Sequence, residues 1–222
     1  MIPIVILAGG ASTRMGHPKG LMEFKSRTWS EVQFERIYPA GIKNILFVLG
    51  HHAELYEAQS PWAKIKTQCP DLNISVIKNP RPELGSFSSL QVGLGRLKIC
   101  DKGVLVLPID VPFLSPHSFS KLYEATLLAN QSAHQTNGQI KAIVPECNGG
   151  GGALRGGHPV WLSRSLINKI LNMNPSLDTS RLDFVIRNLN PSEVKRVAVE
   201  DFLITFNLNT SEDLTKLESF CF

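Results

Sequence analysis

Apolar residues along this chain gather in short continuous runs, separated by longer stretches of mixed polarity. The runs cover residues 3–7, 44–49, 74–77, 103–109 and 140–144. Their near-continuous Val, Ile and Leu content is typical of strands that are buried on both faces, as in a parallel sheet. We therefore expect each run to form a strand of one sheet.

The stretches between the runs contain candidate helices. These cover residues 28–38, 88–97, 116–128 and 163–172. The second would begin with Ser88 and Ser89, residue types that favour helix N-caps, and it carries apolar residues at helical spacing. Alternating strands and helices predict an α/β fold: a Rossmann-like, doubly wound, mostly parallel sheet flanked by helices. In such folds, ligands bind beyond the carboxyl ends of the strands.

Length and composition narrow the class of protein. The 222 residues suit a single domain, 1–222, and 43% hydrophobic with 19% charged residues is typical of a globular chain. The net charge of +4 is spread without a block of Lys or Arg, which fits an anionic small molecule and gives no support for nucleic acid. The four cysteines form no C-x-x-C pair, and no apolar run is long enough to span a membrane. We expect a cytoplasmic protein.

The most informative segment is residues 7–20, LAGGASTRMGHPKG, directly after the first apolar run. Glycines let a backbone approach a ligand closely, and successive N–H groups can point at an anion. Arg14 and Lys19 add positive charge. The spacing fits neither G-x-G-x-x-G nor the P-loop. The segment therefore indicates a phosphate site of another kind, with an ordinary strand-to-turn connection as the plain alternative.

A carboxylate follows the fourth run, in the segment 107–114, LPIDVPFL. Asp110 would lie at the same sheet edge as the glycine-rich segment, where it could hold Mg²⁺ together with substrate phosphates. By itself, an aspartate before Pro112 would as readily start a turn or cap a helix.

The glycine-rich segment resembles the LAGG-x-x-x-R-M-G-x-x-K loop of Rossmann-like nucleotidyltransferases, above all those that attach a nucleotide to molybdopterin. The resemblance implies that Arg14, Lys19 and Asp110 are catalytic and that Asp110 binds the metal. It also implies nucleotide contacts from the loop and from a second segment, 79–90, which is similar to the N-P-x-x-x-x-G-x-x-S-S-L loop of these enzymes. The nucleotide-binding residues are then Leu7, Ala8, Gly9, Gly10, Lys19, Asn79, Gly85, Ser88 and Ser89. Plain helix capping would equally explain the two serines.

Two further segments extend the resemblance toward the C-terminus. Residues 206–214, FNLNTSEDL, are similar to the closing N/D-x-N/D-T-P-E-D-L element, which implies that Asn209 is a metal ligand. Thr210 and Asp213 also fit a helix start with a capping box. Residues 157–160, GHPV, match an element that contacts the acceptor, so His158 either binds the acceptor or fixes a turn. Glycines at 149–152 and 156–157 mark a lid or an uneventful surface loop.

The resemblance implies a Mg²⁺-dependent transfer of a nucleotide from GTP or CTP to a phosphorylated acceptor, with molybdopterin as the acceptor and pyrophosphate as the product. The implied partners are these small molecules, with contact to a molybdoenzyme or cofactor carrier in addition, and neither nucleic acid nor a membrane. Gly9-Gly10 and Asn209 favour the guanylyl branch, whereas the element at His158 favours the cytidylyl branch, so the base stays open. Alternatives are a sugar- or polyol-phosphate nucleotidyltransferase and a non-catalytic nucleotide-binding protein.

Overall fold

The computed structural model describes residues 2–12, 16–97, 102–132, 139–149 and 153–220. Its centre is an eight-stranded sheet with the order β10-β7-β9-β6-β1-β4-β5, in which β8 pairs with β7. The strands of this sheet are β1 (Ile4–Ala8), β4 (Asn44–Leu49), β5 (Asn73–Lys78), β6 (Val104–Pro108), β7 (Ala142–Asn148), β8 (Leu154–Gly156), β9 (Val160–Leu162) and β10 (Val194–Ala198). A separate two-stranded ribbon pairs β2 (Glu23–Phe24) with β3 (Arg27–Thr28).

The predicted doubly wound, mostly parallel sheet is confirmed. Strands β6, β1, β4 and β5 pair in parallel, as do β10 and β7, and all five apolar runs form strands. The short strand β9 lies antiparallel between β6 and β7. The apolar runs did not indicate β8, β9 or β10, because β8 and β9 have only three residues each and β10 is a half-exposed edge strand that Lys195 and Arg196 interrupt.

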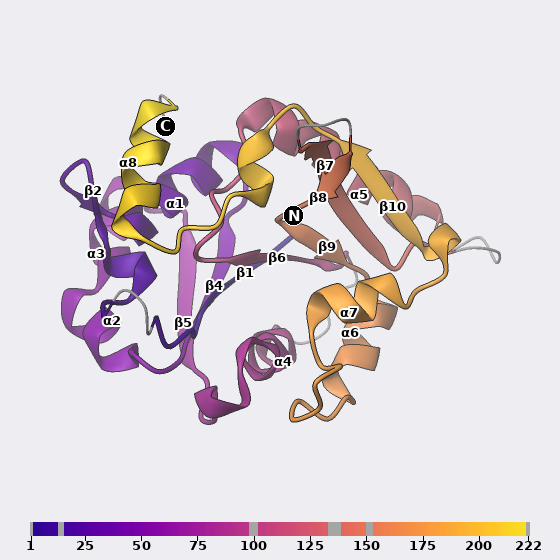
Figure 1. Cartoon of the computed structure of the whole chain (residues 1–222), viewed down its shortest axis with the longest axis horizontal. Coiled ribbons are helices and arrows are strands. Elements are labelled where there is room, and N and C mark those ends of the chain that lie inside the picture. Colours follow the sequence, from indigo (N-terminus) through magenta and orange to yellow (C-terminus); the bar gives the residue numbers. More distant parts are fainter. Residues whose placement is uncertain (1, 13–15, 98–101, 133–138, 150–152, 221–222) are drawn as a thin grey trace.

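Helices cover both faces of the sheet (Figure 1). The side chains of α1, α3, α5 and α8 pack on one face, and those of α4, α6 and α7 pack on the other. The helices are α1 (Trp29–Ile37), α2 (Ala53–Gln59), α3 (Pro61–Gln68), α4 (Ser86–Arg96), α5 (Pro116–Ser132), α6 (Arg164–Leu171), α7 (Leu182–Arg187) and α8 (Ser211–Ser219). Short 3₁₀ segments are Lys19–Leu21, Tyr38–Ala40, Pro82–Leu84, Pro191–Glu193 and Phe202–Thr205. No helix in the described part of the chain has the length and apolar character needed to cross a membrane.

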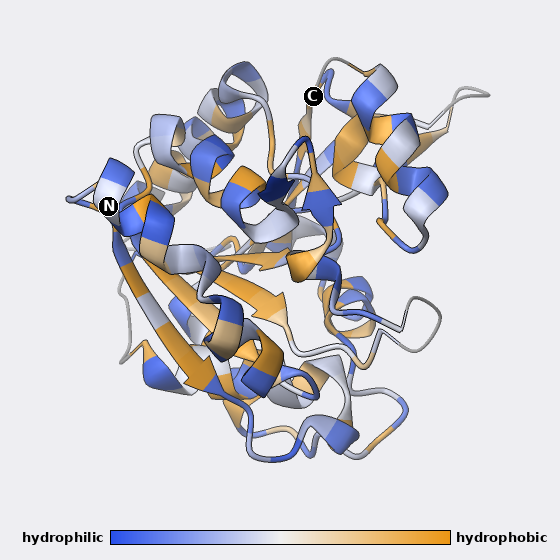
Figure 2. Cartoon of the chain, turned by 90° about the vertical axis from the view of Figure 1, so that its left-hand side faces the viewer, coloured by the Kyte–Doolittle hydropathy of each residue, from blue (hydrophilic) through white to orange (hydrophobic). Residues whose placement is uncertain are grey.

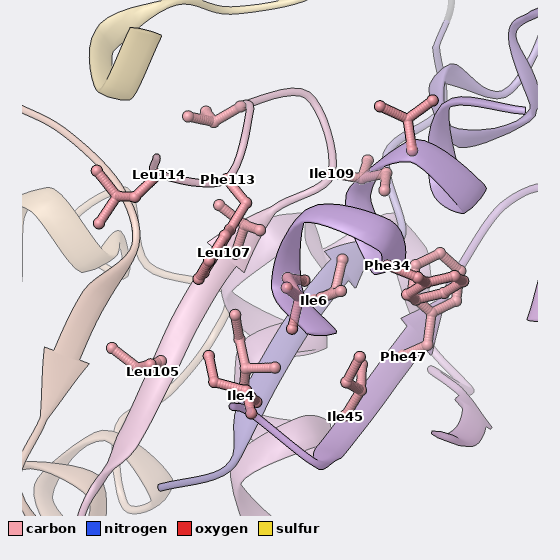
Figure 3. Packing of buried hydrophobic residues seen from close by; sticks show 14 of the residues in the cluster. Ile4, Ile6, Phe34, Ile45, Phe47, Leu105, Leu107, Ile109, Phe113 and Leu114 are labelled. Carbon is pink, nitrogen blue, oxygen red and sulfur yellow. The ribbon is translucent and has the colours of Figure 1, made fainter. Parts of the chain in front are cut away.

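Alternation along the central strands divides the core in two. Ile4 and Ile6 of β1 belong to the cluster beneath α1, whereas Val5 belongs to the cluster beneath α4. Figure 3 shows Ile4 beside Ile45, and Ile6 on the side of Phe34 and Phe47, in the first cluster. In Figure 2 the strands are largely hydrophobic and the hydrophilic residues lie mostly on the surrounding helices and loops. The central strands are thus buried on both faces, which explains their continuous apolar sequence.

The start of α4 differs from the prediction. The helix begins at Ser86, two residues before the expected start, and Gly85 occupies the N-cap position with a φ of 82°. Ser88 and Ser89 therefore lie inside the first turn instead of capping it. The reason is the 3₁₀ turn Pro82–Leu84, which ends in a left-handed conformation that glycine adopts without strain.

Candidate active site

A cavity of about 820 Å³ opens at the carboxyl ends of β1 and β6. Its lining includes Leu7 and Ala8 at the end of β1 and Gly9 and Gly10 directly after it. The cavity continues past Lys19, Asp110 and Asn209 to His158. The structure therefore brings together the predicted phosphate, metal and acceptor residues. Arg14 lies outside the described residues.

The centre of this cavity is a contact among three side chains from distant parts of the chain. The Lys19 Nζ atom lies 2.7 Å from Asp110 Oδ2 and 2.8 Å from Asn209 Oδ1. The Lys19 and Asp110 side chains are only 18% and 24% exposed, so water screens their ion pair less than it would on the surface. Two oxygen atoms thus converge on one cation inside the cavity.

Backbone contacts place Asn209 beside Asp110. The Leu208 N–H donates to the Asp110 carbonyl oxygen over 2.8 Å. Thr210 caps α8, and the Asp213 carboxylate accepts from the backbone N–H groups of both Asn209 and Thr210, each over 2.9 Å. Burial alone would raise the pKa of Asp213, but these hydrogen bonds outweigh it and hold that pKa below its ordinary value. The predicted helix start is confirmed, and it also orients Asn209.

Helix α1 fixes the loop that carries Asp110. The Trp29 indole donates from Nε1 to the Ile109 carbonyl oxygen over 2.6 Å. The Gln33 side chain donates to the Val111 carbonyl oxygen over 2.6 Å and accepts from the Phe113 N–H over 2.9 Å. Trp29 and Gln33 are fully buried, so water is not available to replace these hydrogen bonds. Asp110 is therefore held on both sides by one helix.

The same helix fixes the peptide that follows Lys19. Ser30 Oγ donates to the Gly20 carbonyl oxygen over 2.8 Å, and the Gly20 N–H donates to Tyr56 Oη over 3.0 Å. A Cβ atom at Gly20 would lie 2.5 Å from Tyr56 Oη, so only glycine fits here. Burial raises the pKa of Tyr56 far above its ordinary value and keeps the hydroxyl protonated. No short motif indicated Ser30, Gln33 or Tyr56, because their roles depend on tertiary contacts.

The glycine-rich loop packs tightly against its neighbours. A Cβ atom on Gly50 would lie 2.6 Å from the Cα of Gly9, and one on Gly9 would lie 2.6 Å from Ser89 Oγ. His52 Nε2 lies 2.8 Å from the Ala11 carbonyl oxygen. A Cβ atom on Gly10 would meet no heavy atom within 4 Å, so the backbone there faces open space in the cavity. The backbone atoms of Gly9 and Gly10, which carry no side chain, therefore form part of the cavity wall.

The segment 79–90 divides into residues at the cavity and residues that support them. Ser89 lines the cavity. The Asn79 amide is buried and donates to Ser88 Oγ over 2.8 Å and to Ser89 Oγ over 3.0 Å. Three residues of this segment do not border the cavity: Asn79, Gly85 and Ser88. In this structure they support the first turn of α4, which contains Ser89.

His158 lies on the far wall of the cavity. The backbone N–H of His158 donates to the Ile204 carbonyl oxygen over 3.0 Å, and a Cβ atom on neighbouring Gly157 would lie 2.2 Å from that oxygen. The Nδ1 atom is buried and has no hydrogen-bond partner among the described residues. Burial lowers the pKa of the imidazole, although the Val106 backbone and the Asp110 charge oppose this effect. His158 is therefore a neutral side chain, and its unpartnered Nδ1 atom is enclosed by the protein.

Three arginines that no motif indicated border the same cavity: Arg181, Arg187 and Arg196. Arg181 and Arg187 lie at the two ends of α7, and Arg196 lies on β10. Both elements lie between the motif at residues 157–160 and the motif at residues 206–214. Their own sequences are typical of an ordinary charged surface. Only the fold reveals that these side chains gather at one site.

A mostly parallel α/β sheet with a glycine-lined cavity at the carboxyl ends of its strands is an arrangement suited to binding a phosphorylated ligand. Residues 4–199 match the family model described as the MobA-like NTP transferase domain, and the chain belongs to that family.

Other proteins are similar to this chain over nearly its whole length. A probable molybdenum cofactor guanylyltransferase from Natranaerobius thermophilus is 22% identical over 220 residues, which are 99% of this chain and 96% of that protein. Rv0371c from Mycobacterium tuberculosis H37Rv has a TM-score of 0.72 at 20% identity, covering 99% and 98% of the two chains, and it has also been solved in complex with manganese. An apo UDP-glucose pyrophosphorylase has a TM-score of 0.71 at 11% identity, covering 100% and 98%.

Replacement of Gln33 by leucine tests how Asp110 is held. The Gln33→Leu variant leaves the Val111 carbonyl and the Phe113 N–H buried without partners, at a cost of about 2 to 4 kcal/mol in unfolding free energy. Denaturant unfolding measures this loss. Gln68→Leu, at an exposed position of α3, is the matched control and should leave stability unchanged. An equal effect of the two substitutions would contradict the role of Gln33.

The neutral state of His158 predicts a stability that depends on pH. Below about pH 6.5 an unfolded histidine binds a proton. The buried His158 resists protonation, so the unfolded chain binds more protons and the unfolding free energy falls with falling pH. Denaturant unfolding between about pH 7.5 and 5.5 should show a shallower fall in His158→Gln than in the wild type. The exposed His17→Gln control should keep the wild-type slope; identical slopes in all three proteins would refute the prediction.

Proposed function

We propose that this chain transfers a nucleoside monophosphate from GTP or CTP to the phosphate of molybdopterin. An oxygen of the acceptor phosphate attacks the α-phosphorus, a new phosphoanhydride bond forms, and the bond to the β-phosphate oxygen breaks to release pyrophosphate. The observation that carries this proposal is the convergence of Lys19, Asp110 and Asn209 at the cavity that the glycine-rich loop borders.

The oxygen atoms at this point fit a hard divalent cation. One carboxylate and one amide oxygen already approach a single cation, the Lys19 ammonium, and Mg²⁺ favours such sparse protein ligands combined with substrate phosphates and water. Enzymes of this family typically use divalent metals, and the manganese complex of the mycobacterial structure is consistent with one here. When bound by Asp110 and Asn209, Mg²⁺ would neutralise charge on the reacting phosphates.

The remaining residues take roles that fit their places in or beside the cavity, and Arg14 takes the role that its motif implies. The Gly9 and Gly10 backbone would hold the triphosphate, because no side chain blocks its approach. The flexible Lys19 stem lets the ammonium turn from Asp110 toward the phosphates, where Lys19 and Arg14 would stabilise the leaving pyrophosphate. Ser89 would contact the nucleoside, held in place by Asn79, Gly85 and Ser88, and His158 would contact the acceptor. The attacking phosphate is ionised at neutral pH, so the reaction needs no general base.

The names of similar proteins support a choice of candidate substrates. The guanylyltransferase name of the bacterial relative favours GTP over CTP and molybdopterin over other acceptors. The likeness to a UDP-glucose pyrophosphorylase supports a sugar phosphate as the second candidate acceptor. Pyrophosphate release from GTP, CTP and UTP with molybdopterin, glucose 1-phosphate or erythritol 4-phosphate tests the proposal. We expect the highest rate with GTP and molybdopterin; nucleotide binding without release in every combination would make the chain a non-catalytic binding protein.

Replacement of Lys19 tests its part in charge neutralisation. We expect Lys19→Ala to lower the turnover number by about 100-fold or more, the loss typical of removing one preorganised transition-state contact. The folded structure should survive, as judged by circular dichroism. Lys66→Ala, at an exposed position of α3, should release pyrophosphate at the wild-type rate. Wild-type turnover in Lys19→Ala would remove this residue from the mechanism.

Replacement of Asp110 tests the metal assignment. A neutral amide attracts a divalent cation less than a carboxylate does, so Asp110→Asn should need about tenfold more Mg²⁺, or a larger increase, for half-maximal pyrophosphate release. The measurement is a Mg²⁺ titration at saturating GTP. A half-maximal concentration equal to that of the wild type would show that Asp110 is not a metal ligand.

A further inference from the structure

The cavity extends beyond His158 to a wall that carries an excess of positive charge. Arg181, Arg187 and Arg196 border this wall, and Asp183 is the acidic residue among the lining residues there. At the opposite end of the cavity, Lys19 and Asp110 already pair with each other. The lining at the arginine end therefore carries a net positive charge, which the Glu146 partner of Arg196 reduces but does not cancel.

Ion pairs orient the three guanidinium groups without using up their hydrogen-bonding capacity. Arg181 Nε lies 3.1 Å from Asp183 Oδ1, and Arg187 contacts the other oxygen of the same carboxylate. Burial would raise the pKa of Asp183, but these two arginines outweigh it and hold the pKa below its ordinary value. Arg196 pairs with Glu146 on β7. A guanidinium has more N–H donors than one carboxylate can accept, so each arginine retains donors for a ligand.

These side chains are accessible from the cavity. Arg181, Arg187 and Arg196 are 70%, 71% and 51% exposed, so a ligand can reach them without displacing other elements. Arg196 also extends to the end of β8, two residues before His158, since its Nη1 atom lies 3.7 Å from the Cβ position of Gly156. The three arginines and His158 thus line one continuous cavity in the described part of the chain.

Given the proposed function, we infer that Arg181, Arg187 and Arg196 bind a second anionic group of the acceptor, distinct from the phosphate that attacks. A phosphate of the acceptor must reach the Lys19 end, so a charged group at the arginine end belongs to the rest of the molecule. Thiolates, carboxylates and oxyanions suit guanidinium donors, whereas the neutral hydroxyls of a simple sugar or polyol phosphate do not call for three arginines. The two thiolate sulfurs of molybdopterin meet this requirement.

Single and double substitutions test this inference with molybdopterin as the probe. We expect Arg187→Gln and Arg196→Gln each to raise the KM for molybdopterin by about five- to tenfold, and Arg181→Gln/Arg187→Gln to raise it further. The KM for GTP should not change, because the nucleotide binds at the other end. Added NaCl should raise the molybdopterin KM less in the variants than in the wild type. Lys195→Gln is the matched control, since Lys195 is next to Arg196 on β10 but does not border the cavity.

Equilibrium binding separates failure of this inference from failure of the proposed reaction. Molybdopterin binding, followed by its pterin fluorescence, needs no turnover. Weaker binding in the arginine variants supports the inference even if no pyrophosphate is released, an outcome that would refute only the proposed transfer. Wild-type affinity and KM in the double variant, or glucose 1-phosphate accepted as well as molybdopterin, would overturn the inference while leaving nucleotide transfer intact.

Discussion

The ion pair between Lys19 and Asp110, completed by the Asn209 amide oxygen, is the interaction on which the rest of the site depends. Its members come from the loop after β1, the loop after β6 and the segment before α8. Parallel pairing of β1 with β6 brings the first two to one sheet edge, and the bond from Leu208 to the Asp110 carbonyl adds the third. Because desolvation offsets much of the attraction in a partly buried pair, the contact is better understood as preparation for charged ligands than as a source of stability.

One helix, α1, holds the two segments that carry Lys19 and Asp110. Trp29, Ser30 and Gln33 of α1 hold the backbone on both sides of Asp110 and the peptide after Lys19. Buried polar groups on a helix are costly unless they are paired, and here each finds a backbone partner in a loop. The same helix packs its apolar residues on the sheet, so the folding of the core and the placement of the two charged residues are coupled.

The sequence predicted the parts of the molecule whose physical signal is local. Strands buried on both faces, such as β1 and β6, show as apolar runs, and Lys19, Asp110 and Asn209 stand in motifs directly after buried strands or before a helix cap. The short strand β9 and the edge strand β10 have no such signal, and Gln33 and Tyr56 act through contacts with residues far along the chain. For Asn79 and Ser88, the motif identified the correct segment but not the direction of the side chains. These side chains bond to each other and do not border the cavity.

Direct observation of a metal at the three-residue contact tests the central claim most sharply. Electron paramagnetic resonance of Mn²⁺ can count bound ions on the full chain in the presence of GTP. A single nucleotide-dependent Mn²⁺ should bind the wild type and the Asn207→Ala control, whose altered residue is exposed on the same segment, and it should be lost or strongly weakened in Asn209→Ala. Equal Mn²⁺ binding by all three proteins would contradict the claim that Asp110 and Asn209 form the metal site beside Lys19.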